Sequence, residues 1–66
     1  MKIVLNGKKK ELKKPLTLFH VIQQSCQEPR YVVAEVNGKI IKSPFWNKIT
    51  VKNNDIIELV SFVGGG

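Results

Sequence analysis

Residues 1–12 read MKIVLNGKKKEL, and the Asn-Gly pair inside this stretch decides how it folds. A two-residue Asn-Gly turn accepts the positive φ angles of a type I′ hairpin, and the apolar run Ile3 to Leu5 stands close before it. A strand is therefore predicted before the turn, with Leu5 pairing with Lys8. The same register places Ile3 opposite Lys10, so the return strand is polar and is expected at a sheet edge.

A helix is predicted after Pro15, which stops the strand pairing. Thr17 is a good N-cap, and Leu18, Ile22 and Cys26 follow at helical spacing on one face. This apolar face is narrow, so the helix needs a sheet on which to bury it. Pro29 is expected to end the helix.

A second hairpin is predicted around Asn37-Gly38, between strands at residues 31–36 and 39–42. Pro44-Phe45-Trp46 then interrupts the alternation and predicts a short irregular or 3₁₀ turn whose aromatic rings cover the open end of the core. A brief pairing of Thr50 and Val51 precedes the last strand.

The last strand is predicted over residues 56–63, after a polar turn. Its alternation places Ile57 and Leu59 on one face with Leu18 and Ile22 of the helix, and Glu58, Val60 and Phe62 on the other face. Val60 and Phe62 are then apolar side chains near the surface, which is typical of a protein interface. The alternative is that Phe45-Trp46 folds back and covers them.

The order of elements predicts an α+β domain with one main helix packed on a four- or five-stranded mixed sheet. The β-grasp, ubiquitin-like layout is the simplest arrangement that buries every apolar face. We expect one β-grasp domain over residues 1–62 and a flexible C-terminal glycine tail over residues 63–66. A chain of 66 residues excludes a two-domain enzyme.

Composition excludes several kinds of site and narrows the choice of partner. One cysteine and one histidine cannot form a disulfide or a three-ligand zinc site, so no metal is expected. The chain has no apolar run of about 20 residues and no signal peptide, which predicts a cytoplasmic protein without a membrane partner. The net charge of +6 favours an anionic partner without identifying it.

No catalytic constellation is found in the sequence. His20 has no carboxylate three or four residues away, and Cys26 lies on the apolar helix face. Strand alternation sends Lys9 to the face opposite Lys8 and Lys10, and the aromatic residues are assigned to the core or its ends. Nucleic-acid binding is therefore disfavoured.

The C-terminus is the chemically distinctive part of the chain, because Phe62-Val63 runs directly into Gly64-Gly65-Gly66. Glycine has no side chain, so such a tail can enter a narrow channel and present its α-carboxylate to a reactive centre. Fully extended, the tail reaches about 13 Å from the last strand.

Four motifs carry a resemblance to a known family: Leu5-Asn6-Gly7-Lys8, Val36-Asn37-Gly38-Lys39-Ile40-Ile41, Asn54-Asp55-Ile56-Ile57-Glu58 and Phe62-Val63-Gly64-Gly65-Gly66. Together they resemble the ubiquitin-like sulfur carriers, most closely the sulfur carrier family of thiamine biosynthesis (ThiS family). The chain departs from the family pattern after Ile41, where Lys42-Ser43 replaces a common arginine.

The resemblance implies that a ubiquitin-activating-type adenylyltransferase (ThiF-like) adenylates the Gly66 carboxylate with MgATP. Sulfur from a persulfide donor then converts it to a thiocarboxylate, which donates sulfur to thiazole synthase (ThiG-like) for the thiazole moiety of thiamine. Gly64 and Gly65 are expected to thread the partner active site, and Val60, Phe62 and Val63 to dock on the activating enzyme. ATP and Mg belong to that partner, so the chain is expected to be a carrier without a cofactor of its own, not an enzyme.

Three alternatives remain at this point. The small subunit of molybdopterin synthase resembles the chain in fold and in its Gly-Gly end, but is usually longer. A protein modifier would be joined to lysines through Gly66, and a basic nucleic-acid-binding module would show a steeply salt-dependent affinity.

Overall fold

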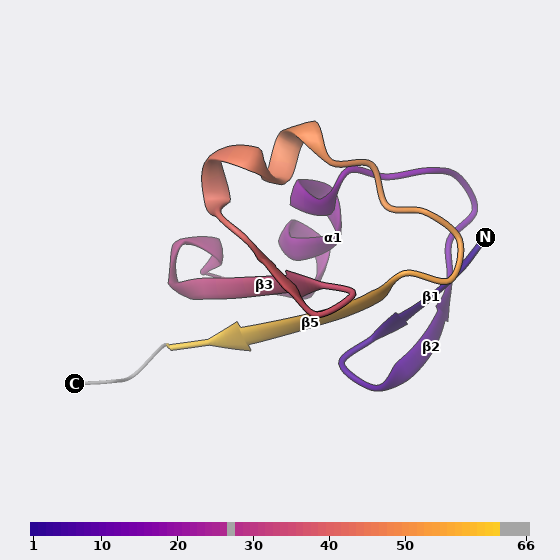
Figure 1. Cartoon of the computed structure of the whole chain (residues 1–66), viewed down its shortest axis with the longest axis horizontal. Coiled ribbons are helices and arrows are strands. Elements are labelled where there is room, and N and C mark those ends of the chain that lie inside the picture. The colour runs from indigo at the N-terminus through magenta and orange to yellow at the C-terminus, as the bar shows by residue number, and fades with distance from the viewer. Residues whose placement is uncertain (27, 63–66) are drawn as a thin grey trace.

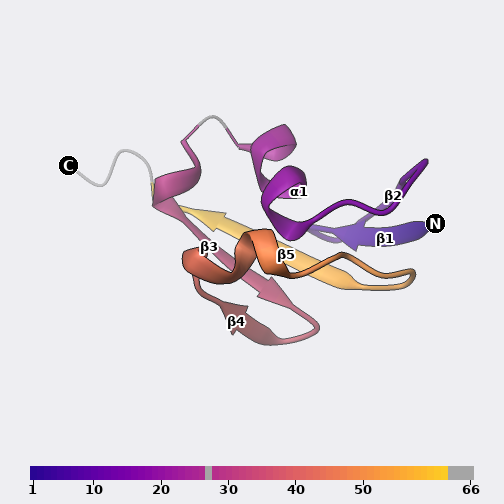
Figure 2. The ribbon, with the colours of Figure 1, turned by 90° about the horizontal axis from the view of Figure 1, so that it is seen from above.

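The structure, a computed structural model, describes residues 1–26 and 28–62. Within these residues, five strands form one mixed sheet in the order β2-β1-β5-β3-β4, and helix α1 packs on one face (Figures 1 and 2). The elements in chain order are β1 (Lys2–Leu5), β2 (Lys8–Glu11), α1 (Leu18–Ser25), the 3₁₀ turn η1 (Pro29–Tyr31), β3 (Val32–Val36), β4 (Lys39–Ile41), the 3₁₀ helix η2 (Ser43–Lys48) and β5 (Ile56–Ser61). This arrangement confirms the predicted β-grasp fold.

The central strand β5 gives the sheet its mixed character. It runs parallel to β1 and antiparallel to β3, while the two hairpin partners, β2 and β4, form the edges. The connection from the first hairpin to the second passes through α1, which lies over the sheet in Figure 2. Strands from both ends of the sequence therefore meet at the centre of the fold.

Both hairpins turn at their Asn-Gly pairs, as predicted. Asn6 and Asn37 have φ angles of 50° and 52°, and the glycines after them have φ angles of 81° and 84°. Asparagine and glycine tolerate these left-handed conformations better than other residues do. The predicted register of the first hairpin is confirmed, because Leu5 pairs with Lys8.

Helix α1 begins as predicted and ends slightly early. The Thr17 side chain accepts a 3.2 Å hydrogen bond from the His20 backbone N–H, which makes Thr17 the N-cap. Cys26 already has an extended backbone, and its N–H donates to the Ile22 carbonyl at 2.9 Å. Tyr31, predicted in a strand, belongs to η1 because Pro29 sets the φ of this turn and the Tyr31 N–H donates back to Glu28.

The core lies between α1 and the sheet. Leu18 and Ile22 of the helix and Ile57 of β5 are fully buried there, as predicted. Leu59 packs against this core on the predicted face, although it is only half-buried. The eight residues of α1 extend about 12 Å, whereas the six residues of β5 extend about 20 Å, so the helix does not cover the whole strand.

Of the two aromatic rings in η2 predicted to cover the core, only one does so. Trp46 is buried, and its indole N–H donates to the Ile41 carbonyl at 2.8 Å. Phe45 is exposed instead of covering the core. A 3₁₀ helix has about three residues per turn, so side chains of neighbouring residues point in different directions and both rings cannot face inward.

The segment before β5 is attached to the helix and to β1. A brief pairing of Thr50 and Val51 is expected from the sequence. Thr50 forms an isolated bridge with Thr17, and the Val51 N–H donates to the Leu16 carbonyl at 2.8 Å. This segment thereby closes the core at the N-terminal end of α1.

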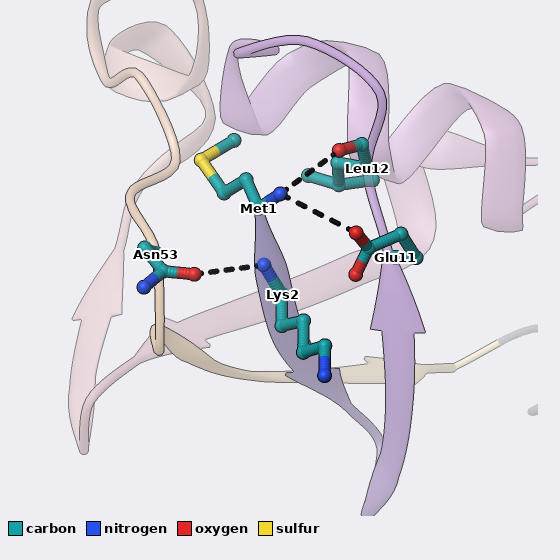
Figure 3. A network of polar contacts seen from close by, with 5 residues as sticks. All are labelled: Met1, Lys2, Glu11, Leu12 and Asn53. Atoms are coloured by element: carbon teal, nitrogen blue, oxygen red, sulfur yellow. Dashed lines mark hydrogen bonds and ion pairs between the residues drawn. The ribbon is translucent and has the colours of Figure 1, made fainter.

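Polar contacts hold the start of β1 on both sides (Figure 3). The Met1 amino group donates to the Leu12 carbonyl at 3.3 Å and lies 3.6 Å from a Glu11 carboxylate oxygen. On the other side, the Lys2 backbone N–H donates to the Asn53 side-chain oxygen at 2.8 Å. Residues from three parts of the sequence thus set where β1 enters the sheet beside β5.

Candidate functional site

The candidate site is the end of β5, because this strand leads directly into the glycine tail. In Figure 1, β5 runs through the middle of the sheet toward the C-terminal end of the chain. Its Ser61 pairs with Val32 of β3, and beyond the strand the Phe62 N–H donates to the Tyr31 carbonyl at 2.8 Å. The backbone of this segment is therefore hydrogen-bonded to β3 and to the Tyr31 carbonyl up to Phe62.

The predicted tail itself, Val63 with Gly64, Gly65 and Gly66, lies outside the described residues. The predicted last strand extended to residue 63, whereas β5 ends at Ser61, and Phe62 adds one further backbone hydrogen bond. What the structure establishes is the position and direction of the strand from which the tail follows.

Two asparagines fix the position of β5 along its neighbours. The Asn6 side-chain oxygen accepts a 2.8 Å hydrogen bond from the Leu59 N–H, and the Asn37 side-chain oxygen accepts a 2.9 Å bond from the Ile56 N–H. The Asn37 amide also donates to Asp55 at 3.0 Å. Each hairpin turn therefore contributes a side-chain hydrogen bond to the backbone of β5.

Strand alternation gives β5 two different faces. Ile57 points into the core, whereas Ile56, Val60 and Phe62 are exposed on the face opposite α1. The exposed fraction is 49% for Val60 and 60% for Phe62. The sequence-based prediction that these two side chains lie at the surface is confirmed.

The alternative, in which Phe45-Trp46 covers Val60 and Phe62, does not occur in the described part of the chain. Trp46 is held against the Ile41 carbonyl and packs in the core. Phe45 is itself exposed, with Lys48 Nζ 5.8 Å from its ring centre. Val60 and Phe62 are therefore not covered by η2.

Two carboxylates interrupt this apolar surface. Glu58 of β5 lies directly opposite Glu35 of β3 in the antiparallel register, next to the Val33–Val60 pair. Like charges at directly opposite positions repel one another. In a chain with a net charge of +6, this pair is a local concentration of negative charge on a face that also carries Lys2 and Lys9.

The other residues considered as chemical groups have structural surroundings. His20 Nδ1 lies 2.8 Å from the Thr17 hydroxyl at the start of the helix. Cys26 is half-buried and packs against the core. In residues 1–26 and 28–62, no group of three or more His, Cys, Asp or Glu side chains could hold a metal ion, and no helix there is long and apolar enough to cross a membrane.

Sequence reasoning missed two features of this site. Ile56 shares the exposed face with Val60, and the alternation that placed Val60 there also applies to Ile56. The side-chain bonds from Asn6 and Asn37 to β5 had no comparable signal, because the bonded residues lie 53 and 19 positions apart in sequence.

Comparisons with known proteins agree with this arrangement. The model of the ThiS family matches residues 3–66. The sulfur carrier protein ThiS of Bacillus subtilis is 36% identical over 63 residues, covering 94% of this chain and 96% of that protein. A thiazole synthase of Paramagnetospirillum magneticum is 29% identical over 66 residues, and there the chain spans only 20% of the relative's length.

A solved structure shows the same fold. The crystal structure of the thiamine biosynthesis protein ThiS from Geobacter metallireducens superposes with a TM-score of 0.85 at 28% identity, with 100% of both chains covered. The family match extends over nearly the whole chain, including the residues that form β5 and the tail that follows it. The chain belongs to the ThiS family.

Proposed function

We propose that this ThiS-family sulfur carrier of thiamine biosynthesis carries sulfur as a thiocarboxylate on its C-terminal residue, Gly66. A free carboxylate is a poor electrophile, so it must first be activated. A partner transfers AMP from MgATP to the Gly66 carboxylate and releases pyrophosphate. Persulfide sulfur then attacks the resulting mixed anhydride, AMP leaves, and an acyl disulfide to the donor is formed. A thiol attacks the donor-side sulfur of this link, which frees the thiocarboxylate and leaves a disulfide between the thiol and the donor.

The observation that carries this proposal is a strand that is hydrogen-bonded on both sides and is followed in the sequence by three glycines. Phe62 is still bonded to the Tyr31 carbonyl, and Gly64 to Gly66 follow two residues later in the sequence. A reach of about 13 Å lets the carboxylate enter an active site while the folded body remains outside. Gly64 and Gly65 allow the tail to pass through a channel too narrow for side chains.

The activating partner is an adenylyltransferase of the ubiquitin-activating type (ThiF-like). Val60, Phe62 and Val63 form its docking surface in this proposal, and the exposure of Val60 and Phe62 supports it. In this proposal, the phenyl ring of Phe62 docks on the activating enzyme and thereby sets the direction in which Gly64 to Gly66 enter its active site. ATP and Mg are bound by the partner, so this chain serves as a protein co-substrate.

The acceptor of the sulfur is a thiazole synthase (ThiG-like), which builds the thiazole moiety of thiamine. Support comes from the thiazole synthase of Paramagnetospirillum magneticum, since a segment similar to this whole chain forms part of that polypeptide. A carrier-like segment on the synthase itself is consistent with direct delivery of sulfur. The proposal places these reactions, and the persulfide donor, in the cytoplasm.

The test is a reconstituted reaction containing this chain, a ThiF-like enzyme, MgATP, a persulfide donor and a thiol reductant. Mass spectrometry of the intact chain should show the mass gain of one sulfur replacing one oxygen at Gly66. Deleting Gly66, or adding one residue after it, should abolish the gain without changing the thermal unfolding, because the last strand already ends at Ser61. Normal thiocarboxylate yield from the shortened chain would refute the proposal.

A further inference from the structure

A second apolar surface lies at the β4 edge of the sheet, on the other side of β3 from β5. A hollow of about 450 Å³ is bordered there by Ile40, Ile41, Lys42, Phe45, Lys48 and Ile49. We refer to these six residues as the β4–η2 groove. Ile40 is 65% exposed and Phe45 is 52% exposed, which is unusual for large apolar side chains.

The backbone of β4 is open to a further strand at Ile40. The Val36–Lys39 pair closes the two-residue turn, and antiparallel pairs alternate between exchanging both backbone hydrogen bonds and exchanging none. Ile40 occupies the alternate position opposite Glu35, so its N–H and C=O point away from β3. Since β4 is the last strand of the sheet, these groups face the open edge.

The charges around the groove are positive. Lys42 and Lys48 border it, Lys39 begins β4, and none of the six groove residues is acidic. Lys48 Nζ lies 5.8 Å from the centre of the Phe45 ring, which holds this cation beside an apolar surface. One carboxylate adjoins the groove, because Glu35 of β3 lies directly opposite Ile40.

We propose that the β4–η2 groove binds an extended segment of a partner protein in which an apolar side chain is flanked by carboxylates. The segment adds as a strand to β4 through Ile40, its apolar side chain contacts Phe45, and its carboxylates pair with Lys42 and Lys48. The site lies at a sheet edge, whereas the tail follows from the central strand. The inference is independent of the thiocarboxylate chemistry.

The probe is a fluorescein-labelled peptide with a Val-Ile-Val centre and two glutamates on each side, titrated into the full chain. A matched peptide carries glutamine at each glutamate position. The acidic peptide should bind at least ~10-fold more tightly at low salt, and the difference should shrink as salt is added. Amide NMR shifts should be largest at residues 39–42 and at Phe45, and small at Val60 and Phe62.

Two sets of variants locate the site. The double variant Lys42→Glu with Lys48→Glu should lose at least ~10-fold in affinity, whereas Lys13→Glu with Lys14→Glu, which changes the net charge equally on exposed residues outside the groove, should lose less than ~3-fold. Ile40→Pro removes the outward N–H without touching a β3–β4 hydrogen bond and should weaken binding more than Ile40→Ala does.

The proposal is overturned if the two peptides bind equally, if the control lysine variant loses as much affinity as the groove variant, or if the shifts centre on the first hairpin. Concentration-dependent self-association through β4 would assign the groove to a second copy of the chain and would also overturn it. A thermal melt of each variant checks that the fold is retained. No activating enzyme or sulfur donor is present, so the outcome does not depend on the chemistry at Gly66.

Discussion

Ile56 and Ile57 are identical side chains at neighbouring positions of β5, yet they differ completely in environment. Ile57 is 0% exposed in the core, and Ile56 is 51% exposed on the uncovered sheet face. Alternation along a strand separates them, and the helix covers only one face of the sheet. The inner face of β5 stabilises the domain, and the outer face is available to partners.

The largest effect on stability is expected from the inner face. Ile57→Ala should lower the free energy of unfolding by about 2–5 kcal/mol, because a buried isoleucine leaves a cavity when it is truncated. In the matched variant Ile56→Ala, the same atoms are removed from the surface, and the change should stay within about 0.5 kcal/mol. Denaturant melts of both variants measure this difference. Similar losses in the two variants would show that the two faces are not distinct.

The next largest effect tests the outer face as a docking surface. Phe62→Asp should weaken the complex with the ThiF-like activating enzyme by at least ~2 kcal/mol, as expected when an apolar interface residue is replaced by a charge. The exposed position of Phe62 predicts little change in the melt. Isothermal titration measures the binding. Unchanged affinity, or global unfolding of the variant, would contradict the proposed role.

A smaller effect is expected at the contacts that hold β5 in register. Asn37→Asp replaces the amide that donates to Asp55 with a second carboxylate, and it should cost about 1–2 kcal/mol of stability. Asn6→Asp is the matched control: its side-chain oxygen accepts a bond from the Leu59 N–H, and a carboxylate can still accept it. We expect a change within about 0.5 kcal/mol there.

Thermal melts at neutral pH compare the two aspartate variants. Both retain a residue that tolerates a positive φ, so a turn defect would affect them alike. Equal destabilisation would mean that the bond from Asn37 to Asp55 does not contribute to the position of β5.

The smallest effect concerns the two opposed carboxylates on the outer face. Glu35→Lys should place a cation opposite Glu58 and raise the free energy of unfolding by a few tenths of a kcal/mol, with a gain that decreases in high salt. If the carboxylates also attract a positively charged partner, the same variant should bind the activating enzyme more weakly. Higher stability together with unchanged binding would show that Glu35 and Glu58 repel each other but do not contribute to binding the activating enzyme.

Much of the fold could be predicted from local patterns. The two Asn-Gly turns, the Thr17 N-cap and the alternation of β5 each depend on residues a few positions apart, and the structure confirms all three. The exposure of Val60 and Phe62 follows from the same alternation. The errors concern the ends of elements and the extent of burial: Tyr31 belongs to η1 instead of a strand, β5 ends at Ser61, and Phe45 is exposed.

The sequence by itself determined the β-grasp layout, the face of β5 that carries Val60 and Phe62, and a chain end of three glycines, because these features follow from turn chemistry, side-chain periodicity and composition. Only the tertiary structure decided which aromatic ring of η2 is buried, how two turn asparagines hold β5, and that Ile40 and Phe45 border one basic groove. These features depend on contacts between residues brought together by the folding of the chain, and no local pattern specifies the depth or direction of such contacts.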